Sequence, residues 1–149
     1  MRAVVQRVSS ARVRVGAEVT GEIGPGLLVF ASVAVDDAPD DARALAEKVA
    51  GLRVFADERG LMNRAIGECG GAILLVSQFT LHGDARRGRR PSFAASAKEP
   101  QARQLFELAG HALEGHGIRV EYGRFGARME VELVNDGPVT ILLDTKRAF

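Results

Sequence analysis

The sequence is poor in cysteine, in aromatic residues and in net charge. Its 149 residues include one cysteine, Cys69, one tyrosine, Tyr122, and no tryptophan, and 20 basic side chains nearly balance 19 acidic ones. A single cysteine excludes an intramolecular disulfide and a zinc site built from several thiolates. A net charge of +1 excludes a polybasic chain, although it leaves room for a local basic patch.

Long apolar segments are missing as well. No apolar run approaches the roughly 18 residues of a membrane-spanning helix, and residues 1–7 lack the apolar stretch of a signal peptide. Hydrophobic residues nevertheless make up 46% of the chain, which is typical of a folded domain rather than a disordered one. We therefore expect one soluble, cytoplasmic domain over residues 1–149, with no membrane association.

The order of apolar and polar segments predicts an α+β domain. An acidic opening at 36–41 indicates the start of a helix, and apolar residues at helical spacing predict a second helix over 100–114. Strands are expected within residues 1–35 and at 52–56, 72–81, 118–122, 128–134 and 139–143. The expected fold is a mixed, barrel-like β-sheet of about eight or nine strands with two helices.

The first candidate site is Ser77-Gln78-Phe79-Thr80, at the end of the most apolar segment. Hydroxyl and amide side chains at a strand end beside a glycine-rich loop are typical of functional sites. A serine nucleophile needs a base within about 3 Å, whereas an extended chain would place His82 roughly 16 Å from Ser77. Three interpretations stay open: a triad completed by a folded loop, hydroxyls with purely structural hydrogen bonds, or backbone N–H groups that form an oxyanion hole.

Two further segments are candidates. Four arginines at residues 86–90 favour contact with phosphates or form a solvated loop. Asn135-Asp136-Gly137-Pro138 is first of all a turn between two strands. A cis Gly137–Pro138 bond would fix two carbonyls side by side, where they could accept hydrogen bonds from an ammonium group. No side-chain cluster has the spacing of metal ligands, so we expect no metal and no other cofactor.

Six segments, in the same order, resemble the D-aminoacyl-tRNA deacylase family. They are Ala3–Ser9, Gly24–Val29, Ser77–Leu81, Arg87–Phe93, Gly123–Ala127 and Asn135–Thr140. The resemblance covers nearly the whole chain, and the set is specific although each segment alone is weak. It implies a homodimeric ester hydrolase that releases D-amino acids from the 3′-terminal adenosine of tRNA, with glycyl-tRNA as a partial substrate.

The resemblance also implies a role for the second motif. In the family the Gly-Pro bond is cis and enters the partner subunit's active site, where its carbonyls hold the α-ammonium group of the substrate. Carried over, Gly137 and Pro138 would reject an L side chain by steric clash. Arg7 would brace the two carbonyls, and Met129 would line the adenosine pocket.

For the first motif the family implies catalysis without a side-chain nucleophile. Backbone N–H groups of residues 77–80, with Phe79 central, would stabilise the oxyanion, while the ribose 2′-hydroxyl helps to activate water. A Thr80 nucleophile is the older alternative. From the residues alone, two other functions stay open: a nucleic-acid-binding module without activity, and a small-molecule esterase with a Ser77 or Thr80 nucleophile.

Overall fold

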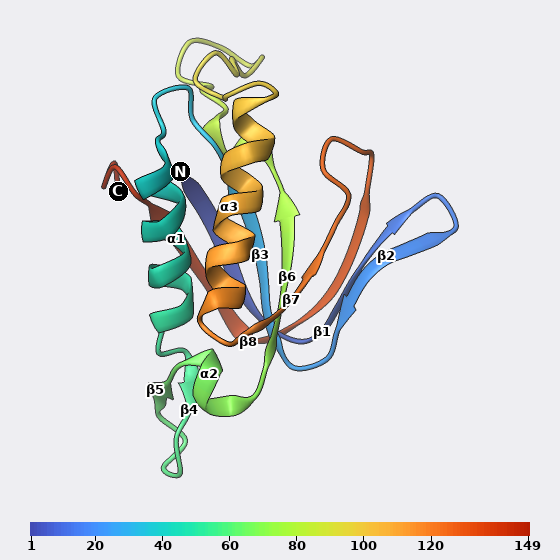
Figure 1. Ribbon diagram of the computed structural model, residues 1–149, viewed down its shortest axis with the longest axis vertical. Helices are drawn as coiled ribbons and strands as arrows, with labels where there is room; N and C mark the ends of the chain where they lie inside the picture. The colour runs from blue at the N-terminus through green and yellow to red at the C-terminus, as the bar shows by residue number, and fades with distance from the viewer.

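The computed structural model describes residues 1–149 as two long helices packed on a strongly curled sheet (Figure 1). The elements are β1 (Arg2–Val15), β2 (Glu18–Ile23), β3 (Gly26–Ser32), α1 (Pro39–Gly51), β4 (Phe55–Ala56), β5 (Met62–Arg64), α2 (Ile66–Cys69), β6 (Ala72–Ser77), the 3₁₀ helix η1 (Phe79–His82), α3 (Gln101–Gly115), β7 (Arg119–Tyr122) and β8 (Glu130–Asp144). The predicted α+β class is confirmed, with the short α2 as a third helix. None of the helices has the length and apolar character to cross a membrane.

Six strands form one mixed sheet in the order β2-β1-β3-β6-β7, with β8 paired to β1. β6 runs parallel to β3 and β7, whereas β1 is antiparallel to β2, β3 and β8. The two strands at the ends of this order, β2 and β7, lie close to each other. The Arg119 side chain on β7 donates a hydrogen bond to the Glu22 carbonyl on β2 at 3.3 Å. A Cβ on Gly21 of β2 would lie 2.5 Å from the Tyr122 carbonyl oxygen. The sheet is therefore nearly closed, which confirms the barrel-like prediction.

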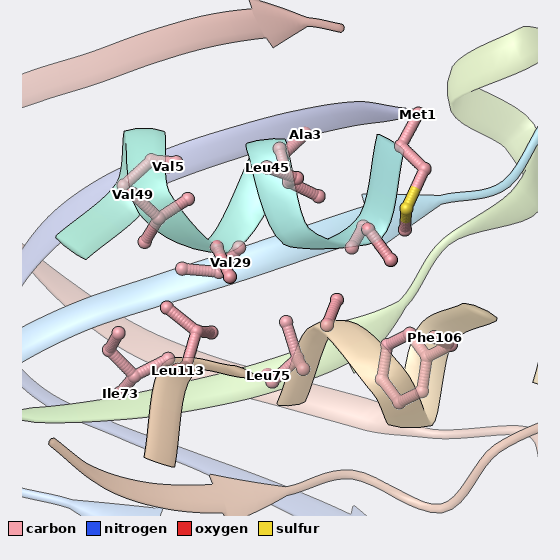
Figure 2. Close-up of a cluster of buried hydrophobic side chains, with 14 of the residues drawn as sticks. Met1, Ala3, Val5, Val29, Leu45, Val49, Ile73, Leu75, Phe106 and Leu113 are labelled. Atoms are coloured by element: carbon pink, nitrogen blue, oxygen red, sulfur yellow. The ribbon is translucent and has the colours of Figure 1, made fainter. Parts of the chain in front are cut away.

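The curl of the sheet creates two apolar cores. The larger core lies between the sheet and the two long helices, where Leu45 and Leu113 face sheet residues such as Val29 (Figure 2). The smaller core fills the inside of the curl and consists of Val8, Ala11, Val13, Ile23, Leu28, Ala72, Leu74 and Val76. Because β3 and β6 separate the two cores, both of their faces are buried, which explains why these strands are apolar along their whole length.

The acidic segment at 36–41 begins α1, as its charge indicates, but the helix starts at Pro39. Asp41 accepts a hydrogen bond from the Ala38 N–H at 2.9 Å, which satisfies a donor in front of the first turn. Asp37 is buried and pairs with the Met1 ammonium at 2.7 Å. Asp37 and Asp41 therefore serve the packing and capping of this helix.

Two predictions of local structure are wrong. The strand predicted over 72–81 ends at Ser77, and the chain then turns through η1. The turn predicted at 135–138 is a bulge inside β8, because the segments on both sides of it pair antiparallel with β1. Val8 pairs with Asn135 and Gln6 pairs with Thr140, so the extra residues bulge out while the strand keeps its direction.

Candidate functional site

A pocket of about 490 Å³ opens where β6 ends, a volume within the ~300–1,000 Å³ range of small-molecule sites. Twelve of its 19 lining residues are hydrophobic. Three residues of the first predicted motif line it, Ser77, Gln78 and Phe79, together with the predicted Met129. Thr80 is exposed and follows directly in η1. The structure thus places the first motif and Met129 at one cavity.

The turn after β6 leaves two main-chain donors unused. The Gln78 N–H donates to the Ala31 carbonyl at 2.8 Å, which extends the pairing of β6 with β3 by one residue. The chain then enters η1, and the N–H groups of Phe79 and Thr80 donate no hydrogen bond within the chain. Two adjacent, fixed donors beside a cavity are suited to stabilise a negatively charged oxygen.

No side-chain base lies beside the hydroxyls of this motif. The Thr80 hydroxyl accepts a hydrogen bond from the Gln78 amide, and Ser77 forms no side-chain hydrogen bond. The His82 ring is hydrogen-bonded to Ser32 instead, with its Nδ1 2.6 Å from the Ser32 Oγ. Asp84 lies two residues after His82 in the sequence and could supply the acid of a triad, but it is bound by Arg86, which holds the pKa of that carboxyl well below its usual range. The loop folds back, but it assembles no triad.

Aromatic rings form much of the pocket wall. Phe79 packs edge-to-face on Phe93 with 5.1 Å between ring centroids, and Phe106 packs on Phe125 at 5.5 Å. The Arg103 guanidinium lies 4.7 Å from the centre of the Phe125 ring. Such a wall suits a flat aromatic ligand. Phe106 could not be predicted as a pocket residue, because nothing in its helical spacing distinguishes the pocket side of the helix from the core side.

The arginine-rich segment forms a hairpin next to this pocket. Asp84 and Ser92 exchange two backbone hydrogen bonds of 2.8 Å, and Phe93 at the base of the hairpin lines the pocket. Arg86 is bound to Asp84 at 2.6 Å. The other three arginines, Arg87, Arg89 and Arg90, are exposed and form no ion pair. The free positive charge of this loop is therefore smaller than its sequence indicates.

The second motif forms the exposed bulge of β8, and the Gly137–Pro138 bond is cis. The Asn135 side chain closes the bulge, since its Oδ1 accepts from the Val139 N–H at 2.9 Å and its Nδ2 donates to the Val139 carbonyl at 3.1 Å. A Cβ on Gly137 would lie 2.5 Å from the Val139 nitrogen. Only glycine therefore fits this position without a shift of the main chain.

The Arg7 side chain holds the bulge through a hydrogen bond to its main chain. Its Nε donates to the Asp136 carbonyl at 2.8 Å and its Nη1 donates to the Val54 carbonyl at 2.5 Å. Its guanidinium therefore contacts the residue before Gly137, and it forms no hydrogen bond to the carbonyls of Gly137 or Pro138. Arg7 links the bulge to the segment that precedes β4.

The two motifs lie at opposite ends of the sheet. Asn135 pairs with Val8, Val8 with Gly26, and Gly26 with Ala72 at the start of β6. Ser77 stands five residues farther along β6, which corresponds to roughly 17 Å along the strand direction. In Figure 1 the chain leaves β6 at the top of the view, whereas β4, next to the bulge contact, lies at the bottom. One chain does not bring its two motifs together.

An aromatic pocket that ends at two unused backbone donors is suited to bind a flat ligand and to polarise a carbonyl group beside it. Comparison with known proteins identifies the family of the chain. It belongs to the family described as D-Tyr-tRNA(Tyr) deacylase, whose model matches residues 4–144.

Individual relatives agree with this family. The D-aminoacyl-tRNA deacylase of Symbiobacterium thermophilum is 60% identical over all 149 residues, which cover 99% of that protein. The D-aminoacyl-tRNA deacylase of Anaeromyxobacter dehalogenans is 59% identical over the full length of both chains. A solved structure named c-Myc DNA Unwinding Element Binding Protein superposes with a TM-score of 0.91 at 36% identity, over 97% of this chain and 98% of the other. A probable eukaryotic D-amino acid tRNA deacylase shares the fold, with a TM-score of 0.81 at 18% identity, over 95% of this chain and 97% of the other.

Proposed function

We propose that the chain is a D-aminoacyl-tRNA deacylase that removes D-amino acids from mischarged tRNA in the cytoplasm, with residues 1–149 acting as one catalytic domain. The family and its full-length relatives support the substrate class. The observation that carries the mechanism is the pair of unused N–H donors at Phe79 and Thr80, beside an apolar pocket.

In the reaction, the oxygen of a water molecule attacks the carbonyl carbon of the ester. The N–H groups of Phe79 and Thr80 donate to the carbonyl oxygen as it becomes negative. The bond from the carbonyl carbon to the ribose 3′-oxygen then breaks, and that oxygen takes up the proton that water has lost. The adjacent 2′-hydroxyl of the ribose relays this proton, in place of the side-chain base that the site lacks. The products are a free D-amino acid and tRNA.

The pocket receives the terminal adenosine of the tRNA. Its aromatic wall offers faces and edges on which a flat base can stack, and Met129 lines the same cavity. The hairpin that carries Arg87, Arg89 and Arg90 lies next to the pocket through Phe93. These three free arginines are therefore positioned to contact phosphates of the tRNA.

A second copy of the chain distinguishes D-aminoacyl from L-aminoacyl esters. Gly137 and Pro138 lie too far from Ser77 in one chain to touch the same ester, so the bulge of one subunit enters the pocket of its partner. The exposed side chains of Val134 and Leu142 lie on β8 on either side of the bulge and give the homodimer an apolar contact surface. Arg7 and Asn135 orient the bulge.

The filter works by geometry. The carbonyls of Gly137 and Pro138 bind the α-ammonium group of the substrate, and the N–H donors hold its carbonyl. With these two groups fixed, an L side chain would collide with the main chain of the bulge, whereas a D side chain points away from it. Glycine has no side chain to reject, so glycyl-tRNA is a partial substrate.

The first test is a time course of D-Tyr-tRNA, L-Tyr-tRNA and Gly-tRNA hydrolysis, with and without EDTA. Fast loss of the D ester, slower loss of the glycyl ester and survival of the L ester, all unaffected by EDTA, are expected. Equal loss of D and L esters would instead identify a general esterase. Inhibition by EDTA would overturn the mechanism without a metal.

The contribution of the second copy is tested by mixing two defective variants. Gly137→Ala spoils the bulge and leaves the pocket intact, whereas Ala127→Trp fills the pocket and leaves the bulge intact. If the bulge acts on the partner, mixed dimers hold one complete site, and a 1:1 mixture regains about a quarter of wild-type activity. A mixture as inactive as its components, although it forms mixed dimers, would place both motifs in the same subunit.

A nucleic-acid-binding module without activity is the second candidate. It is favoured by the three free arginines, and the name of one structural relative describes binding to a DNA unwinding element by that protein. This function predicts tRNA binding without hydrolysis. A small-molecule esterase would instead lose all activity in Ser77→Ala or Thr80→Ala, for which the main-chain mechanism predicts only small losses.

A further inference from the structure

The Phe79 carbonyl in η1 is held by two buried hydroxyl groups from distant parts of the chain. The Ser96 Oγ donates to this carbonyl at 2.9 Å, and the Ser32 Oγ donates to it at 3.3 Å. Both serines are almost fully buried, with 7% and 2% of their surface exposed. Ser32 ends β3, whereas Ser96 follows the arginine hairpin, so the two hydroxyls approach the carbonyl from separate segments.

His82 supports one of these hydroxyls. Its Nδ1 lies 2.6 Å from the Ser32 Oγ, and the ring is 7% exposed. Burial, and then the positive charge of Arg2, lowers the pKa of His82, so the ring is neutral near pH 7. With the proton on Nδ1, the ring donates to Ser32 while Ser32 donates to the Phe79 carbonyl. Hydrogen bonds in such a chain strengthen one another.

The direction of this carbonyl also fixes the direction of a donor. The Phe79 C=O and the Thr80 N–H belong to the same planar trans peptide group, in which they point in opposite directions. Because Ser32 and Ser96 hold the carbonyl toward the buried side, the Thr80 N–H points toward the exposed side, where it has no partner within the chain. A rotation of this peptide plane would move that donor.

We propose that Ser32 and Ser96, with His82 behind Ser32, are positioning residues for the Thr80 N–H. They touch no reacting atom and act only through the orientation of the Phe79–Thr80 peptide group. This inference rests on the proposed function, because the Thr80 N–H matters for catalysis only if it stabilises the oxyanion.

The test compares Ser96→Ala and Ser32→Ala with the wild type under single-turnover conditions. Loss of one hydroxyl loosens the peptide plane, so the rate constant for D-Tyr-tRNA hydrolysis should fall about tenfold, while tRNA affinity stays near the wild-type value. Ser96→Thr keeps a hydroxyl and should restore most of the rate. Thr20→Val is the matched control, since it removes a buried hydroxyl that has no hydrogen-bond partner.

An NMR measurement gives a readout independent of activity. The amide ¹⁵N shift of Thr80 reports the hydrogen bonding of the Phe79 carbonyl and should change in Ser96→Ala but not in Thr20→Val. Rates within twofold of wild type in both alanine variants would overturn the inference, and so would a loss of rate that Ser96→Thr does not reverse. If the wild type itself hydrolyses no D ester, the proposed function has failed, whereas the Thr80 shift still shows whether the hydroxyls hold the peptide.

Discussion

The two ends of the sheet are built in opposite ways. At the end of β6, buried hydroxyls, aromatic rings and a pocket surround the turn, so this end can bind a ligand within one chain. At the other end, the bulge at Gly137 and Pro138 is exposed, and the side chains of Asn135 and Arg7 hold it between two segments of β8 that pair with β1. An exposed main-chain segment that lies far from the pocket of its own chain is consistent with the proposed action of the bulge on a second subunit. If the two ends divide the work in this way, changes to the bulge should have the largest effects on activity.

Gly137→Ala should disable the bulge. A Cβ at this position would lie 2.5 Å from the Val139 nitrogen, so the main chain must shift, and a displacement of about 1 Å in a positioning element can cost about 100-fold in rate. The kcat/KM for D-Tyr-tRNA measures the effect. Gly24→Ala is the control, because a Cβ there meets nothing within 4 Å. A Gly137→Ala variant as active as the control would remove the bulge from the site.

Asn135→Ala should lower the activity less than Gly137→Ala. The bulge loses the side chain that closes it, but Gly137 and Pro138 are unchanged. Two hydrogen bonds between the Asn135 side chain and the main chain of Val139 disappear, and we expect roughly a tenfold fall in kcat/KM. Asn135→Asp keeps the acceptor for the Val139 N–H, so its kcat/KM should lie between those of the wild type and Asn135→Ala. Equal activity of all three proteins would mean that the bulge is fixed without this side chain.

The arginine hairpin beside the pocket should respond through affinity rather than rate. Replacement of Arg87, Arg89 and Arg90 by Gln removes the three free cations of the hairpin, and the slope of log Kd for tRNA against log salt should fall by about 2. Arg86→Gln is the matched control, because this guanidinium is already bound to Asp84. A slope unchanged in the triple variant would show that the hairpin does not contact phosphates.

The smallest effect concerns pH and His82. Burial, and then the charge of Arg2, lowers the pKa of His82 in the folded state, while Asp37 and Asp144 oppose this shift. The unfolded chain therefore takes up a proton more readily. The stability that the neutral ring contributes is complete above the ordinary value of 6.5 and is lost as the pH falls toward the lowered pKa.

Urea unfolding at several pH values measures this dependence. One proton changes the free energy of unfolding by at most about 1.4 kcal/mol per pH unit. The dependence below pH 6.5 should weaken in His82→Gln and persist in His111→Gln, whose histidine is exposed. Identical pH profiles of the two variants would contradict the lowered pKa.

Local sequence patterns predicted those helices and strands that can be identified without knowing which other elements they pack against. Apolar runs revealed β3 and β6, and helical spacing located α3 to within about one residue at either end. The segment at 135–138 was misread because Asn, Gly and Pro favour a turn locally, whereas the outcome depends on β1. That strand is long enough to pair with β8 on both sides of the bulge.

The candidate site was predicted in parts. The residues of both motifs stand out in the sequence, but their separation along the sheet depends on the register of four strands. The contact of His82 with Ser32 joins residues 50 positions apart, and Phe93, Phe106 and Phe125 meet at the pocket only through the packing of a loop against α3. Such contacts have no signal in a single sequence.

The unused donors at Phe79 and Thr80 have a consequence for genetics. A main-chain N–H is present in every amino acid except proline, so substitution of the side chains at these positions does not delete it. If these donors stabilise the oxyanion as proposed, a mutational scan of residues 77–80 would therefore record mild losses for most replacements and a severe one for proline. The most informative change is one that the genetic code does not encode: an ester in place of the peptide link before Thr80, which removes the donor and keeps every side chain.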